Sequence, residues 1–591
     1  MSFTALLQTL PLFEGMPEDL LLPLSDAARV LHLASGDPLY REGDLPDDFH
    51  FLLHGRLQVI ARGSVLGHVN RGEPVGEMSV VSHEPRKATV RALRDATVLA
   101  IRAPQLMTFL AGHPDALMRL TRLIVSRARK SARSDQQLKQ RTGTLAVIPA
   151  LPGLPVLTVA EALVSHMSRW PAARLVTAAH VEALFGPGSA QTPLDGSEAD
   201  LRLRHWLAQL EQRHRHVLFA AAGVDDPWTL RCLRQADRIL VLADAGRQPE
   251  EVTVLKVLQG EGRVAPVELV LQRPEGDDSP HTLAWCHATG ARAHYFLHPG
   301  SATDLAAIAR QISGRGIGLV LGGGGARGFA HIGLVRALEQ LQIPVDVVGG
   351  TSMGAFVGAL LACDFDSVEM AHIARETFVA RNYLNDYTLP KVSLIRGERF
   401  HGRLQAIFGE RRIEELRRTF YCISTNLTTG QPVVHDRGGL ATWVGSSMSV
   451  PGVAPPVAWE GDLLCDGAVV NNLPTDVMHG LERGVIMASN VSSEEDVRAP
   501  GAGIGEPDQR ALLNWKGSNK PPGLSEILMR SATLTSETIT QAASIERADI
   551  YLRMPIDDIG MFDWLRLDAL VERGYEHALS VLEHHPQLGR R

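Results

Sequence analysis

Two strand-turn-helix patterns follow one another between Ile317 and Leu360, and both carry glycines at the turn. The first begins with an apolar run, Ile317 to Leu321, which is typical of a buried parallel strand. Four consecutive glycines, 322–325, end that run, and an amphipathic helical pattern begins near Phe329. Glycine adopts backbone angles closed to other residues, so several amide N–H groups can point into one small space at a helix start. The stretch therefore predicts an α/β fold with a turn suited to a bound or developing anion.

The second pattern places a serine at the turn. An apolar run from Val345 to Val348 predicts a strand, and Ala355 to Ala362 predicts a helix. Between them lies a GxSxG sequence in which Gly350 and Gly354 flank Ser352. Such a turn is strained, exposes the hydroxyl and lies at the positive end of a helix, which favours negative charge on the oxygen. Ser352 is therefore the candidate nucleophile.

A serine hydroxyl needs a neighbouring base to become an effective nucleophile. The candidate base is Asp466, which ends a short apolar run and is followed by Gly467. The three motifs GGGGARG, GTSMG and DGA, in this order, resemble those of the patatin-like phospholipases. That family uses a Ser-Asp dyad without histidine, and the resemblance covers roughly the last half of the chain.

The resemblance implies a three-layer α/β/α hydrolase domain and a role for each motif residue. Ser352 is then the nucleophile and Asp466 the base, with no metal or cofactor required. Arg327 is implied as a structural or charge-stabilising residue. The glycines implied to shape the oxyanion hole are Gly323, Gly324, Gly325 and Gly328, and the supporting glycines are Gly350, Gly354 and Gly467.

Two other enzyme classes remain open from these motifs. The glycine run also fits GxGxxG, with Asp346 about where a dinucleotide-binding fold has its ribose-binding acid, although a nucleophile elbow follows Asp346 at once. An ordinary α/β-hydrolase would add a histidine after the acid, but none of the candidates lies in a recognisable loop motif. Those candidates are His479, His577, His584 and His585. We expect His331, on the first helix, to be a packed or capping residue.

The N-terminal part has short apolar runs separated by glycines, which predicts a β-roll or barrel. The runs are 49–53, 57–61 and 96–101, and the glycines expected at turns are Gly36, Gly43, Gly55, Gly63, Gly67, Gly72 and Gly76. Within it, the sequences VGEM and PRKAT resemble the phosphate-binding cassette of cyclic nucleotide-binding domains. The resemblance implies cyclic AMP or cyclic GMP as an effector, bound by Gly76, Glu77, Arg86 and Ala88. Lys87 departs from the family, which has a small residue there.

The middle of the chain alternates apolar runs with helical segments, which predicts a parallel α/β sheet. After the first run, the sequence 151–155 lacks the glycines and lysine of a nucleotide-binding P-loop, so we expect no nucleotide hydrolysis. A long basic helix is predicted from Ala116 to Arg141. We therefore expect three domains: residues 1–141 as a β-roll with a C-terminal helix, 142–312 as a Rossmann-like domain and 313–591 as the patatin-like domain.

The order of the three domains resembles that of the neuropathy target esterase group of lysophospholipases, over nearly the whole chain. The stretches Trp228 to Asp237 and Ser447 to Gly452 add to this likeness. Three departures stand out: the N-terminus has no membrane helix, only one nucleotide-binding-like domain is present, and Gly445-Ser446 replaces an expected Arg-Ala. The implied substrate is a lysophospholipid or phospholipid. A non-lipid serine esterase and a lipid- or nucleotide-binding module without catalysis remain alternatives.

Composition limits the compartment and the partners. The formal charge of −7 gives no indication of a nucleic-acid partner. Five scattered cysteines suit a reducing compartment, and no apolar stretch approaches the length of a membrane span. We therefore expect a cytoplasmic protein, with peripheral contact to the inner face of a membrane as a further expectation. The oligomeric state stays open. Residues 492–520 are expected to form a lid or surface loop, and the apolar segments 524–534 and 564–582 to pack mainly on the core.

Overall fold

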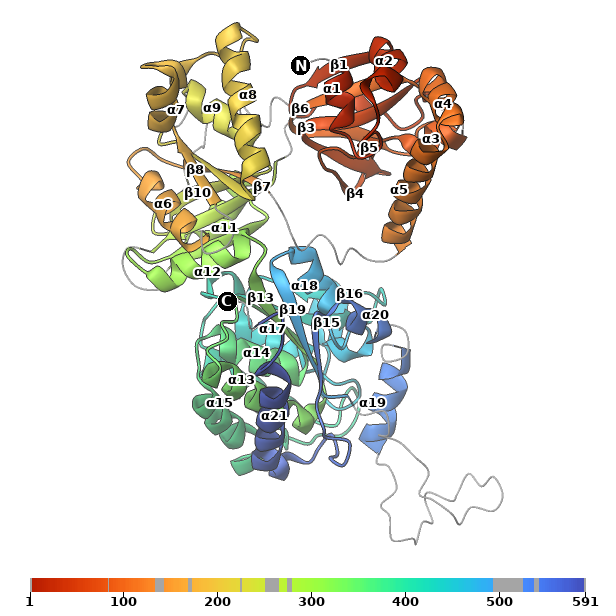
Figure 1. The fold of residues 1–591 in the computed structure, drawn as a ribbon. Helices are drawn as coiled ribbons and strands as arrows, with labels where there is room; N and C mark the ends of the chain where they lie inside the picture. The colour runs from red at the N-terminus through yellow and green to blue at the C-terminus, as the bar shows by residue number, and fades with distance from the viewer. Residues whose placement is uncertain are drawn as a thin grey trace, which may run out of the picture. The chain divides into compact units, whose positions relative to one another are not determined.

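The computed structural model describes residues 3–82, 84–132, 143–167, 173–223, 226–249, 265–273, 279–492, 524–535 and 541–588. The chain divides into two compact units, Met1–Ala309 and Arg310–Arg591 (Figure 1). The first unit holds an antiparallel sheet and a parallel sheet, and the second holds one mixed sheet. Two predicted segments lie partly outside the described residues: 493–520 of the expected lid and 133–141 of the expected long helix.

The N-terminal sheet of the first unit is antiparallel, with the strand order β1-β6-β3-β4, and β2 and β5 pair with β6 and β3. This confirms the predicted β-roll. Its strands are β1 (Ala28–Leu33), β2 (Pro38–Tyr40), β3 (Asp48–Ala61), β4 (Ser64–Val69), β5 (Pro74–Val75) and β6 (Thr89–Arg102). Its helices are α1 (Phe3–Gln8), α2 (Glu18–Asp26), α3 (Glu77–Ser82), α4 (Ala103–Gly112) and α5 (Pro114–Ala132).

Two glycines predicted to mark turns lie inside strands instead. Gly55 joins two predicted runs into the single long strand β3, at an irregularity in its pairing with β6. Its φ is +89°, and a Cβ at this position would come within 2.5 Å of the carbonyl oxygen of Asp95. Gly67 lies within β4. The prediction was wrong at both positions, because glycine also allows a bulge or a close strand crossing.

The second sheet of the first unit is parallel, in the order β12-β11-β10-β7-β9-β8, as predicted. Its strands are β7 (Gly143–Pro149), β8 (Ala173–Thr177), β9 (His216–Ala220), β10 (Arg238–Asp244), β11 (Val267–Gln272) and β12 (Ala293–Leu297). The helices are α6 (Val156–Met167), α7 (Ala178–Phe185), α8 (Glu198–Arg213), α9 (Pro227–Gln235), α11 (Thr282–Thr289) and α12 (Ala302–Ile312). The pattern of apolar runs did not predict β12, because Ala293 to Leu297 is short and carries His294 among its apolar residues.

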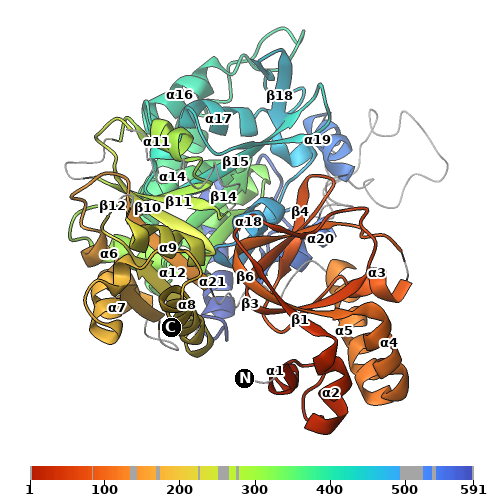
Figure 2. The same ribbon diagram turned by 90° about the horizontal axis from the view of Figure 1, so that it is seen from above.

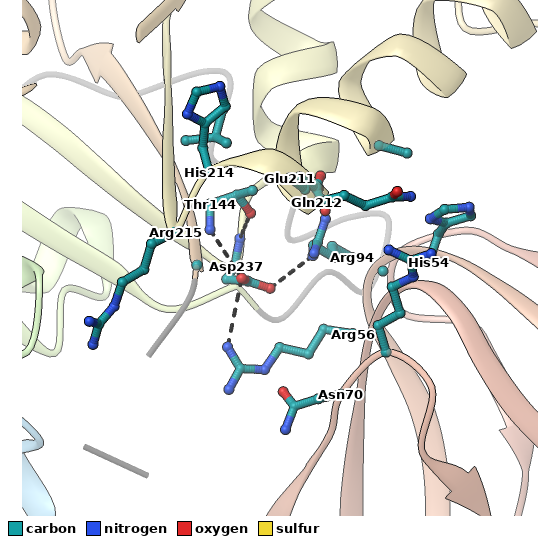
Figure 3. Close-up of a pocket in the computed structure, with 15 residues that line it drawn as sticks. His54, Arg56, Asn70, Arg94, Thr144, Glu211, Gln212, His214, Arg215 and Asp237 are labelled. Atoms are coloured by element: carbon teal, nitrogen blue, oxygen red, sulfur yellow. Dashed lines mark hydrogen bonds and ion pairs between the residues drawn. The ribbon is translucent and has the colours of Figure 1, made fainter. Parts of the chain in front are cut away.

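A buried ion cluster joins the two sheets of the first unit (Figure 3). Arg94 of β6 donates to Glu211 of α8 at 2.8 Å, and its Nε lies 2.9 Å from Asp237 Oδ1. Asp237 also accepts from the amide of Thr144 at 3.1 Å and pairs with Arg56 at 3.7 Å. Burial alone would lower the pKa of Arg94, but the charges of Asp237 and Glu211 more than offset burial and raise it.

Removing the central arginine should destabilise the first unit. We expect Arg94→Ala to lower its free energy of unfolding by about 3 kcal/mol, because two buried carboxylates lose their main counter-charge while Asp237 keeps Thr144 and Arg56. The matched control is Arg91→Ala, on the same strand, because the Arg91 guanidinium donates two hydrogen bonds to the neutral Gln58 side chain. Calorimetric unfolding of the full chain measures both. Equal effects of the two substitutions would contradict the prediction.

The second unit is built on a mixed sheet in the order β17-β18-β15-β14-β13-β19-β20, with β16 paired to β15. The segment from β15 to β20 along this order is parallel, and β16, β17 and β18 are antiparallel. The strands are β13 (Gly316–Leu321), β14 (Val347–Thr351), β15 (Thr419–Asn426), β16 (Pro432–His435), β17 (Val457–Trp459), β18 (Asp462–Asp466), β19 (Gly484–Asn490) and β20 (Ile550–Arg553).

Helices cover both faces of this sheet, which gives the predicted three layers (Figures 1 and 2). Alternate strand residues enter two cores: Leu319 and Val348 pack with the helices of one face, and Val320 and Val347 pack with Met478 on the other. Helix α21 packs along α13, so the C-terminal segment serves the core as expected. The helices are α13 (Ala330–Gln340), α14 (Met353–Ala362), α15 (Ser367–Ala374), α16 (Glu398–Phe408), α17 (Leu440–Ser447), α18 (Thr475–Leu481), α19 (Leu524–Thr535), α20 (Gln541–Arg547) and α21 (Leu567–Leu582).

Across the described ranges, none of the helices combines the length and the apolar character needed to cross a membrane.

Candidate active site

Ser352 lies at the sharp turn between β14 and α14. Its backbone has φ 54° and ψ −122°, a region that non-glycine residues rarely adopt and that a strained nucleophile elbow requires. The flanking glycines permit the tight approach of strand and helix. A Cβ at Gly350 would lie 2.5 Å from the backbone of Gly354, and one at Gly354 would lie 2.1 Å from the carbonyl oxygen of Leu321.

Asp466, at the end of β18, faces the serine hydroxyl. Ser352 Oγ donates to Asp466 Oδ2 at 2.7 Å, and the amide of Ala468 donates to Oδ1 at 2.9 Å. Strand β18 pairs with β15, and β15 pairs with β14, so the sheet brings together two residues 114 positions apart in the chain. The structure thus places the two sequence-predicted residues in direct contact.

The environment of Asp466 changes its acidity. The carboxyl is fully buried, and burial raises its pKa from 3.8 to about 7, although the hydrogen bonds from Ala468 and Ser352 act in the opposite direction. A carboxylate with this pKa can accept a proton near neutral pH far better than an exposed aspartate. The pair therefore has the geometry and the acidity for a nucleophile and its base.

The histidines considered for a triad contribute no hydrogen bond to this pair. Among the described residues, the hydrogen bonds of Ser352 Oγ and of the Asp466 carboxylate involve each other and Ala468, and no histidine. His331 is buried and bonds to Ser489 Oγ and the carbonyl of Gly322, as expected for a packed residue. Asp346, the residue of the dinucleotide alternative, is likewise engaged, because it accepts from Arg310 and the amide of Ile317.

The glycine loop, residues 322–328, lies beside Ser352, and its residues make different hydrogen bonds and packing contacts. The Gly323 amide donates to Asn472 Oδ1 at 3.0 Å, and the Ala326 amide donates to the carbonyl of Met561. Gly325 has φ +59°, and a Cβ there would lie 2.3 Å from the Met561 carbonyl. Gly328 packs closely on Met353, because a Cβ at this position would lie 2.2 Å from Met353 Cγ.

A mostly apolar cavity opens onto the serine. Arg327 also lines it and donates from Nε to the carbonyl of Ile559. Ser492, the first residue of the expected lid, and Thr533 of α19 also line it. Its apolar lining consists of Met353, Leu384, Ile395, Phe400, Met448, Val450, Val453, Ala454, Ala468, Met561, Phe562 and Trp564. This site can admit an acyl chain next to a nucleophile.

Residues 447–449 support both members of the pair, a role that the sequence did not reveal. The hydroxyl of Ser447 accepts from the amide of Ser352 at 3.0 Å, and the carbonyl of Ser449 accepts from the amide of Asp466 at 2.9 Å. In the sequence, this stretch was notable only as part of the resemblance to the neuropathy target esterase group. Hydroxyl and carbonyl acceptors can be supplied by almost any sequence, so the contacts become visible only in the fold.

The four residues expected to bind a nucleotide lie together in the β-roll. Arg86 is buried, donates to the carbonyls of Gly76 and Asp48 at 2.7 Å each, and stacks on the Tyr40 ring. Glu77 is buried at the start of α3, and Ala88 follows in the chain just before β6. The Lys87 side chain is exposed and pairs with Glu84 at 2.6 Å, so it does not crowd the site.

Comparison with known proteins matches three families to three segments. Residues 319–479 match the patatin-like phospholipases, 141–303 the P-loop like domain of the neuropathy target esterase family, and 30–113 the cyclic nucleotide-binding domain. Lysophospholipase nte1 of Aspergillus terreus is 29% identical and covers 95% of this chain. Patatin-like phospholipase domain-containing protein 7 of the mouse is 30% identical over 94% of it. Over nearly its whole length, the chain is similar to the neuropathy target esterase group of patatin-like proteins.

The chain spans less than half the length of these relatives. The chain spans 42% of the Aspergillus protein and 45% of the mouse protein. Among solved structures, a cyclic nucleotide-binding domain from Methylobacillus flagellatus is 25% identical to this chain, with a TM-score of 0.21. The match includes 23% of this chain and 81% of the Methylobacillus chain. The β-roll assignment therefore depends on the strand order and the family match.

Asn472 holds the glycine loop against the nucleophile elbow. Its Oδ1 accepts from the Gly323 amide, and its Nδ2 donates to the Gly323 carbonyl at 3.2 Å and to Ser492 Oγ at 3.0 Å. We expect Asn472→Ala to lower kcat by about 10²-fold with little change in KM, because the loop amides lose their position.

The adjacent asparagine provides the control for this substitution. Asn471 Nδ2 bonds to Asp476 and not to the glycine loop. We expect Asn471→Ala to leave kcat within a few-fold of wild type, whatever its effect on thermal stability. Steady-state kinetics on an acyl ester measures both. Unchanged kcat in Asn472→Ala would show that the loop holds its position without this side chain.

Proposed function

We propose that this protein is a serine esterase that hydrolyses the acyl ester bond of lysophospholipids or phospholipids. The observation that carries the proposal is the 2.7 Å hydrogen bond from Ser352 Oγ to the buried Asp466, whose pKa is raised to about 7 by burial. Ser352 of this pair lines a mostly apolar cavity, whose side chains suit the hydrocarbon part of an acyl group. A metal or cofactor is not required by this mechanism.

The reaction proceeds through an acyl-enzyme. Ser352 Oγ attacks the ester carbonyl carbon while its proton passes to Asp466 Oδ2. The oxygen of the tetrahedral intermediate accepts from the amides of Gly324 and Gly325, since the Gly323 amide is held by Asn472. The carbon–oxygen bond to the leaving alcohol breaks, and Asp466 returns the proton to that alcohol. Asp466 then takes a proton from water as the water oxygen attacks the acyl carbon. The bond from the acyl carbon to Ser352 Oγ breaks, the fatty acid leaves, and Asp466 returns the proton to Ser352 Oγ.

The substrate class follows from the cavity and from the relatives. Twelve apolar side chains surround the serine, and several relatives carry the name lysophospholipase. A single acyl chain in a monoacyl lipid is the simplest match to this lining. The alternatives are a non-lipid ester, and a domain that binds lipid without cleaving it.

We further propose that cyclic AMP or cyclic GMP acts as an effector through Gly76, Glu77, Arg86 and Ala88. Arginine suits a cyclic phosphate because its planar guanidinium donates two charge-assisted hydrogen bonds. In the described structure these donors bond to the Gly76 and Asp48 carbonyls, so a phosphate would have to replace them. The effector proposal predicts that saturating cyclic nucleotide changes kcat/KM. An unchanged kcat/KM together with no binding in calorimetry would contradict it.

We propose three domains, residues 1–141, 142–312 and 313–591, with the middle one as a scaffold between sensor and enzyme. None of the five cysteines, all of them described, forms a disulfide bond, which suits a reducing compartment and supports a cytoplasmic location. Peripheral contact with a membrane follows from a lipid substrate, because such substrates lie in aggregates.

The test measures fatty acid release from lysophosphatidylcholine by the full chain, beside hydrolysis of a short soluble ester. We expect both reactions, with the lipid preferred above the concentration at which it aggregates. Hydrolysis of the soluble ester alone would favour a non-lipid esterase. No hydrolysis of either, with the fold intact by circular dichroism, would favour the binding module.

A further inference from the structure

The segment 386–396 of the second unit forms a hairpin with an apolar tip. Three large apolar side chains lie within six residues and are largely exposed: Tyr387 at 74%, Leu389 at 82% and Val392 at 68%. Single exposed apolar residues are ordinary on protein surfaces, but a group on one short loop indicates a surface that meets another apolar phase. We call residues 386–396 the apolar hairpin.

The apolar hairpin is held in shape by its own hydrogen bonds. Tyr387 bridges to Ile395, the amide of Thr388 donates to the Leu394 carbonyl at 3.0 Å, and the amide of Arg396 donates to the Asp386 carbonyl at 2.9 Å. At the tip, the amide of Lys391 donates to the Leu389 carbonyl. The buried Ser393 hydroxyl donates to the Ile395 carbonyl. The exposed side chains are therefore displayed by a defined backbone and do not result from a loose loop.

The base of the apolar hairpin forms part of the wall of the active-site cavity. The amides of Leu394 and Ile395 donate to the carbonyls of Gly452 and Val453, each at 3.0 Å. Ile395 and Val453 both line the cavity that holds Ser352, and Leu384, just before the hairpin, lines it too. One rigid element thus joins the apolar tip to the acyl-binding cavity.

The charges around the hairpin favour a lipid surface. Between Arg381 and Arg399 the sequence has four basic and two acidic side chains, in a chain whose net charge is −7. The acidic Asp386 is bonded at the hairpin base by the amide of Arg399. Lys391, Arg396 and Arg399 are exposed. Basic residues beside apolar and aromatic ones match the chemistry of a phospholipid interface, where tyrosine also partitions well.

We propose that the apolar hairpin docks on the surface of a phospholipid bilayer and inserts Tyr387, Leu389 and Val392 among the lipids. This inference rests on the proposed function, because it explains how an enzyme with this cavity reaches its substrate. The base of the hairpin would then hold the cavity wall at the lipid surface, and a lipid could move from the membrane toward Ser352 without full exposure of its acyl chain to water.

The experiment measures co-sedimentation of the full chain with vesicles of phosphatidylcholine, with and without phosphatidylglycerol. The Ser352→Ala background prevents hydrolysis, so binding is measured whether or not the proposed function holds. We expect the triple substitution Y387S/L389S/V392S to weaken binding by about ten-fold or more, because apolar side chains that become buried among the lipids supply the attachment. The control is Val368→Ser on α15, which removes an equally exposed side chain that lies outside the hairpin. We expect its binding to match that of the unsubstituted chain.

Two further measurements separate docking from other roles. With Ser352 intact, the triple variant should keep the soluble-ester activity and lose activity on vesicle-borne lysophospholipid. In Tyr387→Trp, the tryptophan emission should shift to shorter wavelength when vesicles are added. Unchanged vesicle binding by the triple variant, or an emission that does not respond to lipid, would overturn the proposal. A changed elution volume of the triple variant without lipid would also overturn it, since the hairpin would then bind a second copy of the chain.

Discussion

Ser352→Ala and Asp466→Asn should each lower kcat for an acyl ester by about 10⁴-fold or more, and the double variant should be no slower than the slower single variant. The two residues act as one unit through the 2.7 Å hydrogen bond, so removal of either abolishes the same proton transfer. The residual rate should come from the glycine loop and from substrate binding. The measurement is the initial rate of fatty acid release under saturating substrate.

The pH dependence of wild-type kcat/KM reports the acidity of the proposed base, and Asp466→Asn tests which residue that base is. Because burial raises the pKa of Asp466 to about 7, the base form predominates above that pH, and kcat/KM should rise through about pH 7 to a plateau. An active Asp466→Asn would contradict the dyad. In that case His479, His577, His584 and His585 would be substituted next.

Motifs confined to a few adjacent residues allowed much of the fold and site to be predicted. The nucleophile elbow and the aspartate at the end of β18 each combine a strand end with a glycine, so their local backbone can be predicted from adjacent residues. The parallel and antiparallel sheets followed from the spacing of apolar runs in the same way. Gly55 was misplaced because its neighbour across the strand, at Asp95, is forty residues away.

Contacts between distant segments account for what the sequence could not reveal. Ser447 and Asn472 hold the elbow and the glycine loop through side-chain bonds that span 95 and 149 residues. Serine and asparagine are common polar residues, so nothing local separates these two from solvated ones. The ion cluster around Arg94 and the apolar hairpin are similar cases. Charged and apolar residues look ordinary in the sequence, and their meaning depends on what buries or exposes them.

Asp466→Asn should also make the protein more stable at alkaline pH. Since the folded-state pKa of Asp466 is about 7 and its ordinary value is 3.8, the folded protein holds this proton more tightly than the unfolded chain. The contribution of Asp466 to wild-type stability should therefore be greatest below about pH 4, decline as the pH rises through about 7, and then level off. Asparagine has no charge to bury and keeps the amide contact of Ala468 in reach. The gain should be small near pH 4 and about 4 kcal/mol near pH 8.

Denaturant unfolding of both proteins across this pH range measures the gain. The control is Asp558→Asn, because Asp558 is exposed and its hydrogen bond to Arg573 lowers its pKa, so this substitution should give no alkaline gain. A stability difference between wild type and Asp466→Asn that did not change with pH would mean that Asp466 is ionised at no unusual cost. The proposed base would then need another source for its strength, whereas a gain that grows through pH 7 would show that the fold sacrifices stability to hold a buried carboxylate beside Ser352.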